Sequence, residues 1–257
     1  MNGIAEEWRK IASLSAIKEA LRMAVRCPLT LWSFIIQGRQ KAVQSQVKHL
    51  MGYTKTNTQC LADYWQAITS KRDLYTDIKR ALVASPHSNL QEAPEYLYVI
   101  MRVLRPEVVV ETGVAAGISS AFILQALEDN NKGKLYSIDL PNYNLPDDLT
   151  FIPAGTQPGF AIPEGLKKRW QLRLGTSRDL LPGLLAEIGR VDIFLHDSDH
   201  TYENMLFEFV TAWDHLPQGG LLLSHDIAFN NAFRDFSRKI KRKPTELYLT
   251  GTGAIAK

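Results

Sequence analysis

One stretch, residues 108–124, constrains the fold more than any other part of the chain. It reads Val-Val-Val-Glu-Thr-Gly-Val-Ala-Ala-Gly-Ile-Ser-Ser-Ala-Phe-Ile-Leu. A β-branched run ends in an acid, Glu111, glycines follow at Gly113 and Gly117, and the apolar residues after them have helical spacing. This order predicts a buried strand, a tight turn and a helix. The first free N–H groups of such a helix point at whatever lies over the carboxyl end of the strand, so the turn suits an anionic or carboxylate-bearing ligand.

The alternation of strand and helix continues to the end of the chain. Further strands are predicted at residues 134–139, 170–174, 191–196, 221–224, 246–249 and 254–256, with a hairpin turn at 250–253. Helices are predicted near Leu180, at 202–215 and at 231–241. The pattern is typical of an α/β protein with a doubly wound, mostly parallel, seven-stranded sheet of Rossmann-like type. Residues 141–169, rich in Pro, Gly, Asn and Asp, predict a long loop that covers a ligand.

The N-terminal third has a different character. Residues 1 to about 50 are predicted to be helical with a break at Pro28, and further helices are predicted at 61–84 and 94–104. A polar segment, 54–58, is the candidate linker. We therefore expect residues 1–90 to form a helical extension or cap, and residues 91–257 to form the ligand-binding domain.

This N-terminal extension is locally cationic. Between Trp8 and Leu50, eight basic residues stand against one acid, Glu19. Basic charge beside Trp32 and Phe34 is compatible with an interfacial helix that lies peripherally on anionic lipid. A cap on the α/β domain, or a contact with a second subunit of a homo-oligomer, is favoured because amphipathic helices of soluble domains are more common.

The composition narrows the class of protein. The chain has 257 residues, of which 45% are hydrophobic and 22% charged, as in an ordinary soluble globular protein. A net charge of +3 gives no argument for nucleic acid as a partner. Cys27 and Cys60 lack metal-ligand spacing, no signal-peptide pattern is present, and no apolar run approaches the roughly 18 residues of a membrane span. We therefore expect a cytoplasmic protein with reduced thiols.

Residues that follow the predicted strands should converge on one crevice, because parallel strands end at the same edge of a sheet. The residues concerned are Glu111, Gly113, Asp139, Asp197, Asp199, His225 and Asp226. A carboxylate at Asp139 can accept both hydroxyls of an adenosine ribose, and a helix cap is the alternative. The spacing Glu-x-Gly-x-x-x-Gly differs from the Gly-x-Gly-x-x-Gly of dinucleotide enzymes, which disfavours a nicotinamide cofactor.

Histidines and acids are concentrated after the fourth and fifth predicted strands. They are His196, Asp197, Asp199 and His200 at one strand end, and His225 and Asp226 at the next. Such groups can bind a divalent cation, with oxygen ligands favouring magnesium or manganese and imidazole admitting zinc or iron. Alternatively, one acid or histidine deprotonates a hydroxyl directly as a general base. A purely structural role, as caps of the following helices, is the third possibility.

Four segments resemble a known family. They are residues 110–117 (Val-Glu-Thr-Gly-Val-Ala-Ala-Gly), 138–141 (Ile-Asp-Leu-Pro), 195–203 (Leu-His-Asp-Ser-Asp-His-Thr-Tyr-Glu) and 218–226 (Gln-Gly-Gly-Leu-Leu-Leu-Ser-His-Asp). Together they resemble the class I S-adenosylmethionine-dependent methyltransferases, in particular the branch with macrocin O-methyltransferase-like and cephalosporin-hydroxylase-like proteins. The resemblance covers roughly Pro94 to Lys257 and leaves out residues 1 to about 90.

The resemblance implies a Rossmann-like methyltransferase fold with S-adenosylmethionine as cofactor. Glu111, Gly113 and Gly117 are then expected to surround its methionine part, and Asp139 to hold its ribose. The expected cofactor-binding residues are Glu111, Gly113, Gly117, Ser119, Asp139, Ser177 and Asp197. Thr176 stands where many members of the family carry an acid, which weakens any assignment of adenine contacts.

The same resemblance implies roles for the second cluster. Asp197, His225 and Asp226 occupy the positions that bind a divalent cation such as Mg²⁺ in metal-using members, although His225 replaces a carboxylate of several of them. Asp199 is then the expected base, with His200 beside it as a second catalytic residue.

The implied activity is methyl transfer to a hydroxyl oxygen of a small molecule or a sugar. Two alternatives remain open at this point. One is a metal-dependent hydroxylase on the same fold, and the other is a non-catalytic scaffold that docks at a membrane through the cationic N-terminal extension.

Overall fold

The structure is a computed structural model that describes residues 39–53, 60–83, 85, 94–140, 152–153, 155–247 and 250–257. The helices predicted within residues 1–38, the interfacial helix and the linker at 54–58 lie outside the described residues. Among the helices described, none combines the length and the apolar character that a membrane crossing requires.

Seven strands form one sheet with the order β3-β2-β1-β4-β5-β7-β6. They are β1 (Val108–Thr112), β2 (Lys134–Asp139), β3 (Trp170–Leu174), β4 (Ile193–His196), β5 (Leu221–Ser224), β6 (Thr245–Leu247) and β7 (Thr252–Ala256). The first five are parallel to one another, whereas β7 runs antiparallel to both β5 and β6. The direction of strand order reverses between β1 and β4, which is where sheets of this type bind ligands.

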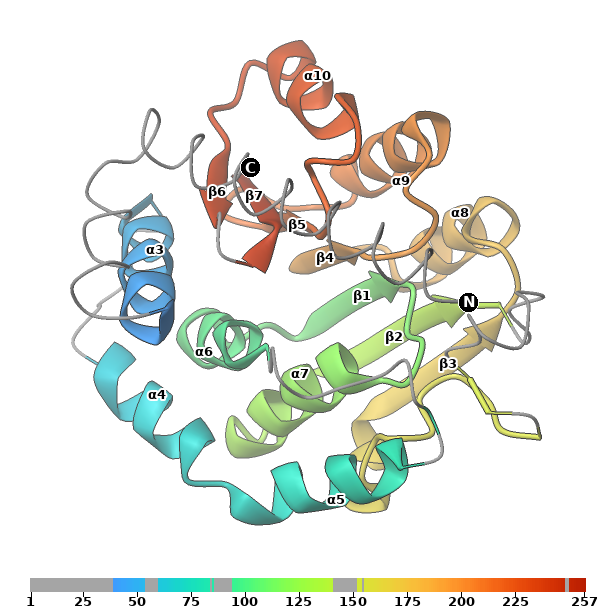
Figure 1. Ribbon diagram of the computed structural model, residues 1–257. Helices are drawn as coiled ribbons and strands as arrows, with labels where there is room; N and C mark the ends of the chain where they lie inside the picture. Colours follow the sequence, from blue (N-terminus) through green and yellow to red (C-terminus); the bar gives the residue numbers. More distant parts are fainter. Residues whose placement is uncertain are drawn as a thin grey trace, which may run out of the picture.

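Helices cover both faces of the sheet (Figure 1). The helices of the α/β region are α6 (Glu95–Leu104), α7 (Ile118–Asp129), α8 (Ser177–Ile188), α9 (Tyr202–Trp213) and α10 (Ala232–Lys239), with a 3-10 helix, η2 (Glu164–Arg169), before β3. One apolar core joins α6 and α7 to the sheet, and a second core joins α8, α9 and α10 to its other face. The predicted doubly wound architecture is therefore confirmed.

Three further helices precede this region: α3 (Arg39–Tyr53), α4 (Leu61–Thr69) and α5 (Arg72–Leu82). Their buried residues, among them Val47, Trp65 and Ile78, belong to the same apolar core as α6 and α7. The described part of the N-terminal extension therefore packs on the α/β domain, as a cap would. Whether it also contacts a second subunit stays a prediction.

Two predicted elements differ from the structure. The single helix expected at 61–84 is divided between α4 and α5, because the hydroxyls of Thr69 and Ser70 donate to the carbonyls of Trp65 and Gln66 and end the first helix. The hairpin turn expected at 250–253 lies earlier in the chain. Because Leu247 pairs with Thr252, the last two residues of that segment belong to β7.

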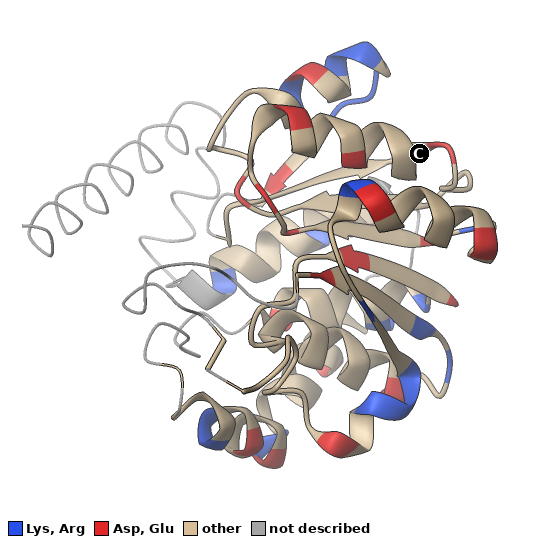
Figure 2. Ribbon diagram, turned by 90° about the vertical axis from the view of Figure 1, so that its right-hand side faces the viewer, with Lys and Arg blue, Asp and Glu red and all other residues tan. Residues whose placement is uncertain are grey.

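Acidic residues stand within the sheet itself, which Figure 2 shows as red segments among tan strands. Glu111 is completely buried, and Asp139 is 6% exposed. Carboxylates are rarely buried to this degree without a dedicated set of partners. Both stand at the carboxyl ends of adjacent strands, so these ends are the place to look for a functional site.

Candidate active site at the carboxyl ends of β1, β2, β4 and β5

The glycine turn after β1 is held against other parts of the chain. Gly113 and Gly117 have φ angles of +84° and +89°, in the left-handed region that favours glycine. A side chain at Gly113 would clash with the carbonyl of Asp197 at the end of β4, and one at Gly117 would meet Gly159 and Ile162. Because neither glycine has a side chain, other backbone segments come close to the turn. At Gly117 this neighbour is the loop 159–162, whereas the sequence analysis expected a ligand there.

Glu111 is the buried centre of a polar network under this turn. Its Oε1 accepts hydrogen bonds from Ser120 at 2.5 Å and Ser137 at 2.6 Å, and the indole of Trp170 donates to Ser137 Oγ at 2.7 Å. Its Oε2 is buried without a hydrogen-bond partner among the described residues. Burial raises the pKa of Glu111 to about 7, with Asp197 and Asp139 adding repulsion and the two serines opposing the shift.

Asp139, at the end of β2, fixes the glycine turn. Its Oδ2 accepts the backbone N–H groups of Val114 at 2.9 Å and Ala115 at 2.8 Å, and its Oδ1 accepts the N–H of Leu140 at 2.7 Å. These are charge-assisted bonds to backbone, which position a loop strongly. The carboxylate expected to hold a ribose therefore also shapes the turn that would receive the rest of the cofactor.

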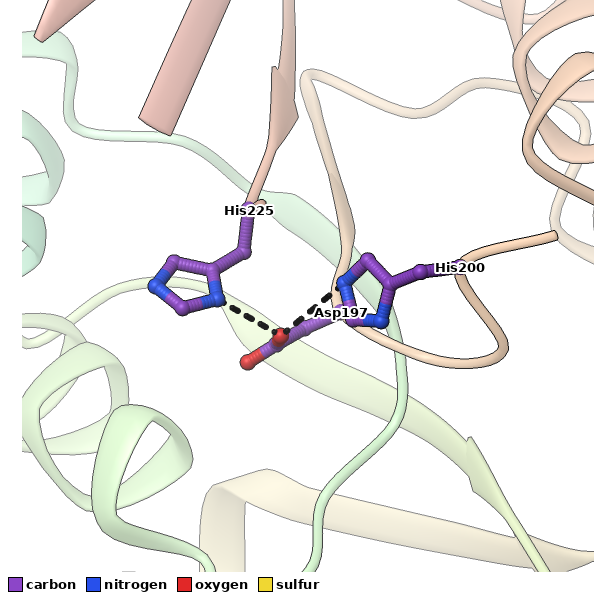
Figure 3. A group of neighbouring side chains, drawn as sticks. All are labelled: Asp197, His200 and His225. Atoms are coloured by element: carbon purple, nitrogen blue, oxygen red, sulfur yellow. Dashed lines mark ion pairs between the residues drawn. The ribbon is translucent and has the colours of Figure 1, made fainter. Parts of the chain in front are cut away.

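Four side chains that follow β4 and β5 form a compact cluster, which we call the His-Asp cluster: Asp197, His200, His225 and Asp226. His225 Nδ1 lies 3.1 Å from Asp197 Oδ1 and 3.5 Å from Asp226 Oδ2. His200 Nε2 lies 3.8 Å from each of the same two oxygens. Figure 3 shows both imidazole rings directed at the Asp197 carboxylate from opposite sides. The predicted convergence of the β4 and β5 ends is thus observed, and His200 joins it.

The backbone and the electrostatics of the His-Asp cluster are both unusual. Asp226 has a φ of +51°, a left-handed conformation that residues other than glycine seldom adopt and that strained functional sites often contain. Burial acts to lower the pKa of His225, but Asp197 and Asp226 outweigh it and raise this pKa to about 9. Burial, reinforced by His196, lowers the pKa of His200.

Asp199 points elsewhere. Its two carboxylate oxygens accept hydrogen bonds from the backbone N–H of Thr201 at 3.1 Å and from the Thr201 hydroxyl at 2.9 Å, and the residue is exposed. This is the arrangement of a local loop acid at the start of a helix. The carboxylate of Asp199, the expected base, therefore lies at the start of α9, outside the His-Asp cluster.

Glu208 on α9 hydrogen-bonds to residues at the ends of β1 and β4, next to the candidate site. The sequence analysis did not single it out. It is completely buried and accepts from Thr112 at 2.5 Å, Ser198 at 2.7 Å and Asn204 at 3.0 Å. His196 Nδ1 lies 2.6 Å from the same carboxylate. Glu208 thereby joins the ends of β1 and β4 to α9. Its position inside an amphipathic helix, among apolar neighbours, was the only signal in the sequence.

The remaining predicted cofactor residues lie at helix starts. Ser119 is half-buried in the first turn of α7. Ser177 opens α8 and its hydroxyl lies 3.4 Å from Asn204 Oδ1, next to the Glu208 network. Before it, the Thr176 hydroxyl accepts the N–H of Asp179 and caps α8, which gives this residue a structural role.

A pocket of about 510 Å³ adjoins the His-Asp cluster. Its walls include Phe229 in the β5–α10 segment, Arg234 on α10 and Gly251 in the β6–β7 turn. Gly251 is also next to Asp226, since a side chain built on it would lie 3.5 Å from Asp226 Oδ1. Phe229, whose side chain is 71% exposed, presents its ring to this pocket.

Comparison with known proteins agrees with this geometry. Residues 110–227, which run from β1 through the His-Asp cluster, match the family model described as "Methyltransferase domain". No curated protein is similar enough to the chain to count as a match.

Solved structures resemble the chain in fold at low sequence identity. An O-methyltransferase from Bacillus cereus in complex with SAH is 15% identical, covers 73% of this chain and 92% of its own, and has a TM-score of 0.51. The SAH-bound methyltransferase PaMTH1 of Podospora anserina is 15% identical, with coverage of 81% and 93% and a TM-score of 0.48. The calicheamicin methyltransferase CalS11 is 18% identical, with coverage of 72% and 92% and a TM-score of 0.45. Residues 110–227 therefore carry a methyltransferase domain, on a fold shared with solved methyltransferases.

Proposed function

We propose that this methyltransferase methylates a hydroxyl oxygen of a small molecule or a sugar. The observation that carries the proposal is the His-Asp cluster, which gathers two acids and two imidazoles beside the glycine turn of β1. A hydroxyl is a poor nucleophile until it loses its proton, so its methylation calls for such groups. A methyltransferase acting on a thiol or an amine has less need of them.

The residues under the glycine turn fit the cofactor. No described residue donates a hydrogen bond to the buried Glu111 Oε2, and the ammonium group of the methionine part would supply a donor. Gly113 and the first turn of α7 would lie along the same part, with Ser119 as a further contact. Asp139, whose carboxylate at the end of β2 accepts the backbone N–H groups that shape the turn, would also lie at the ribose.

The main task of the protein in this mechanism is to position the acceptor relative to the cofactor. S-adenosylmethionine supplies an activated methyl group on a sulfonium that leaves readily. The contact of Gly113 with the Asp197 carbonyl fixes the distance between the cofactor turn and the His-Asp cluster. This geometry would hold the acceptor oxygen in line with the methyl group and keep water out. The cluster would take the hydroxyl proton directly, or would hold a cation that lowers the pKa of the hydroxyl.

The pocket beside Gly251 is the proposed site for the rest of the acceptor. It offers the exposed ring of Phe229 for packing, and Asn231, Arg234 and Asp235 for hydrogen bonds. An aromatic face among several polar groups suits a polyhydroxylated or mixed-polarity ring. The acceptor would then enter over α10 and present one hydroxyl to the cluster.

Cofactor binding tests the first half of this proposal. Calorimetry with S-adenosylmethionine and with S-adenosylhomocysteine should show one site per chain. Asp139→Ala should raise the Kd about 100-fold, because the variant loses three charge-assisted bonds that shape the turn.

The control for this experiment is Asp77→Ala, which removes an exposed acid paired with Arg80 on α5 and should leave the Kd unchanged. Thermal melting of both variants confirms that they fold. Absence of binding to the unmodified protein would reject the assignment of the cofactor cradle. An acceptor screen with sugars, phenols and small aliphatic alcohols then tests the oxygen acceptor, and transfer only to thiols or amines would reject it.

A further inference from the structure

We infer that the exposed face of α10, with the segment that follows it, is a docking surface for an anionic phospholipid bilayer. Six cations lie within ten residues there, and we call them the α10 basic patch: Arg234, Arg238, Lys239, Lys241, Arg242 and Lys243. The inference goes beyond the proposed function and does not depend on it, because it concerns where the protein binds and not what reaction it catalyses. It also concerns a different part of the chain from the cationic N-terminal extension.

The first argument is the division of α10 into two faces. Ala232, Phe233 and Phe236 are buried in the core that α10 shares with α8 and α9. All six cations of the α10 basic patch are exposed. Figure 1 places α10 at the edge of the molecule, and Figure 2 shows its basic residues as blue segments at the top. The apolar face thus holds the helix on the domain, while the cationic face is turned outward.

The second argument is the concentration of unpaired charge. Residues 234–243 contain one acid, Asp235, and have a net charge of +5, whereas the whole chain has a net charge of +3. Among the described residues, the one carboxylate paired with the α10 basic patch is that of Asp235, 3.6 Å from Arg238. Arg234 donates to the amide oxygen of Asn231. The rest of the chain is slightly acidic, so the positive potential is concentrated on this face.

The third argument is what lies beside the charge. Clustered Lys and Arg side chains on a helix attract the negative surface of a membrane that contains anionic lipids. Among the described residues, the two exposed large aromatic side chains are Tyr202, 37% exposed, and Phe229, 71% exposed. Both line the 510 Å³ pocket together with Arg234. Aromatic rings next to cations suit the boundary between headgroups and acyl chains. Because Arg234 belongs to both the patch and the pocket, docking would bring the pocket to the bilayer surface.

A nucleic acid fits this surface less well. Single strands bind in positively charged grooves that follow their backbone. The α10 basic patch lies instead on the outer side of one short helix, and Asp235 and Glu246 line the pocket next to it. A strand that continued from the patch across the pocket would bring its phosphates to these carboxylates. A bilayer surface requires no groove, and its anionic headgroups complement the patch directly.

Co-sedimentation of the full chain with vesicles, without cofactor or acceptor, tests this inference. The probes are vesicles of phosphatidylcholine alone and vesicles with an equal amount of phosphatidylglycerol. We expect binding to the anionic vesicles only, weakened at least about tenfold when the salt concentration rises from about 0.1 M to about 0.5 M. The combined variant Lys239→Gln, Lys241→Gln, Lys243→Gln should bind about 100-fold more weakly, because each cation near an anionic surface contributes about fivefold. The same three lysines changed to Arg should leave binding unchanged.

The matched control removes three exposed lysines from other parts of the α/β domain: Lys132→Gln, Lys134→Gln and Lys168→Gln. These residues lie before and at the start of β2 and in η2. The control loses the same net charge as the α10 variant, yet its binding should fall no more than about threefold, since screening limits the effect of distant charges. Circular dichroism establishes that both variants fold.

A second comparison separates α10 from the N-terminal extension. The variant Arg9→Gln, Lys10→Gln, Lys18→Gln also removes three positive charges, and it should bind the anionic vesicles like the unmodified protein. Loss of binding in this variant with none in the α10 variant would overturn the inference.

Other results would also overturn it. They are absence of binding to the anionic vesicles, equal binding to neutral vesicles, and equal losses in the α10 variant and the matched control. Absence of vesicle binding together with binding of a mixed-sequence RNA through the same three lysines would identify a nucleic acid as the partner. Failure of cofactor binding or of methyl transfer to oxygen would reject the proposed function and leave the docking surface standing, because the vesicle experiment uses neither ligand.

Discussion

Replacing Asp197 with Asn should lower the rate of methyl transfer about 1000-fold, equivalent to about 4 kcal/mol in the activation barrier. Asp197 Oδ1 is the atom shared by His225 at 3.1 Å and His200 at 3.8 Å. Asn has nearly the same shape, so the fold and the Gly113 contact should persist while the negative charge is lost. Either way of activating the hydroxyl, by proton transfer to the cluster or by a bound cation, depends on that charge.

Asp199→Asn is the paired comparison, and it should change the rate no more than about threefold, within the range usual for an exposed loop acid. Both substitutions remove one charge from the same short segment, but only Asp197 faces the imidazoles. Initial rates with S-adenosylmethionine and the best acceptor from the screen give the comparison. A severe loss in Asp199→Asn with a mild one in Asp197→Asn would restore the sequence-based choice of Asp199 as the base.

In the cofactor-free protein, ionisation of Glu111 should lower the free energy of unfolding by about 3 kcal/mol as pH rises from acid to neutral, and replacing Glu111 with Gln should remove this loss. The folded protein holds the Glu111 proton until about pH 7, whereas the ordinary pKa is 4.5. Between these values the folded state binds more protons than the unfolded state, so the free energy of unfolding falls as pH rises through this window. Gln cannot ionise. The difference in unfolding free energy between variant and wild type should therefore grow in favour of the variant from pH 4.5 to pH 8.

Urea denaturation at pH 4.5, 6 and 8 measures this difference. The control is Glu107→Gln, whose carboxyl is 71% exposed and pairs with Lys132 on the surface. That variant should differ from wild type by no more than about 0.5 kcal/mol at any of these pH values. A Glu111→Gln difference that stays constant across the range would show that folding does not raise the pKa of Glu111.

Much of the fold was predictable because its signals are local. The buried run at 108–112, the left-handed glycines at Gly113 and Gly117 and the alternation of strand with helix follow from side-chain sterics and periodicity. The break between α4 and α5 was missed because it depends on which side-chain hydroxyls bond back to the helix, a choice that the helical stripe of apolar residues conceals.

The site shows the same division. The sequence alone determined that acids and histidines follow neighbouring parallel strands, because the direction of each strand fixes which edge of the sheet its last residue reaches. Only the tertiary structure decided which of them meet. His200 and His225 turn toward Asp197 while Asp199 turns to Thr201, and Glu208 reaches the strand ends from α9. These choices depend on contacts between residues far apart along the chain, such as Gly113 with Asp197, which set the path of the loops and so the directions of their side chains.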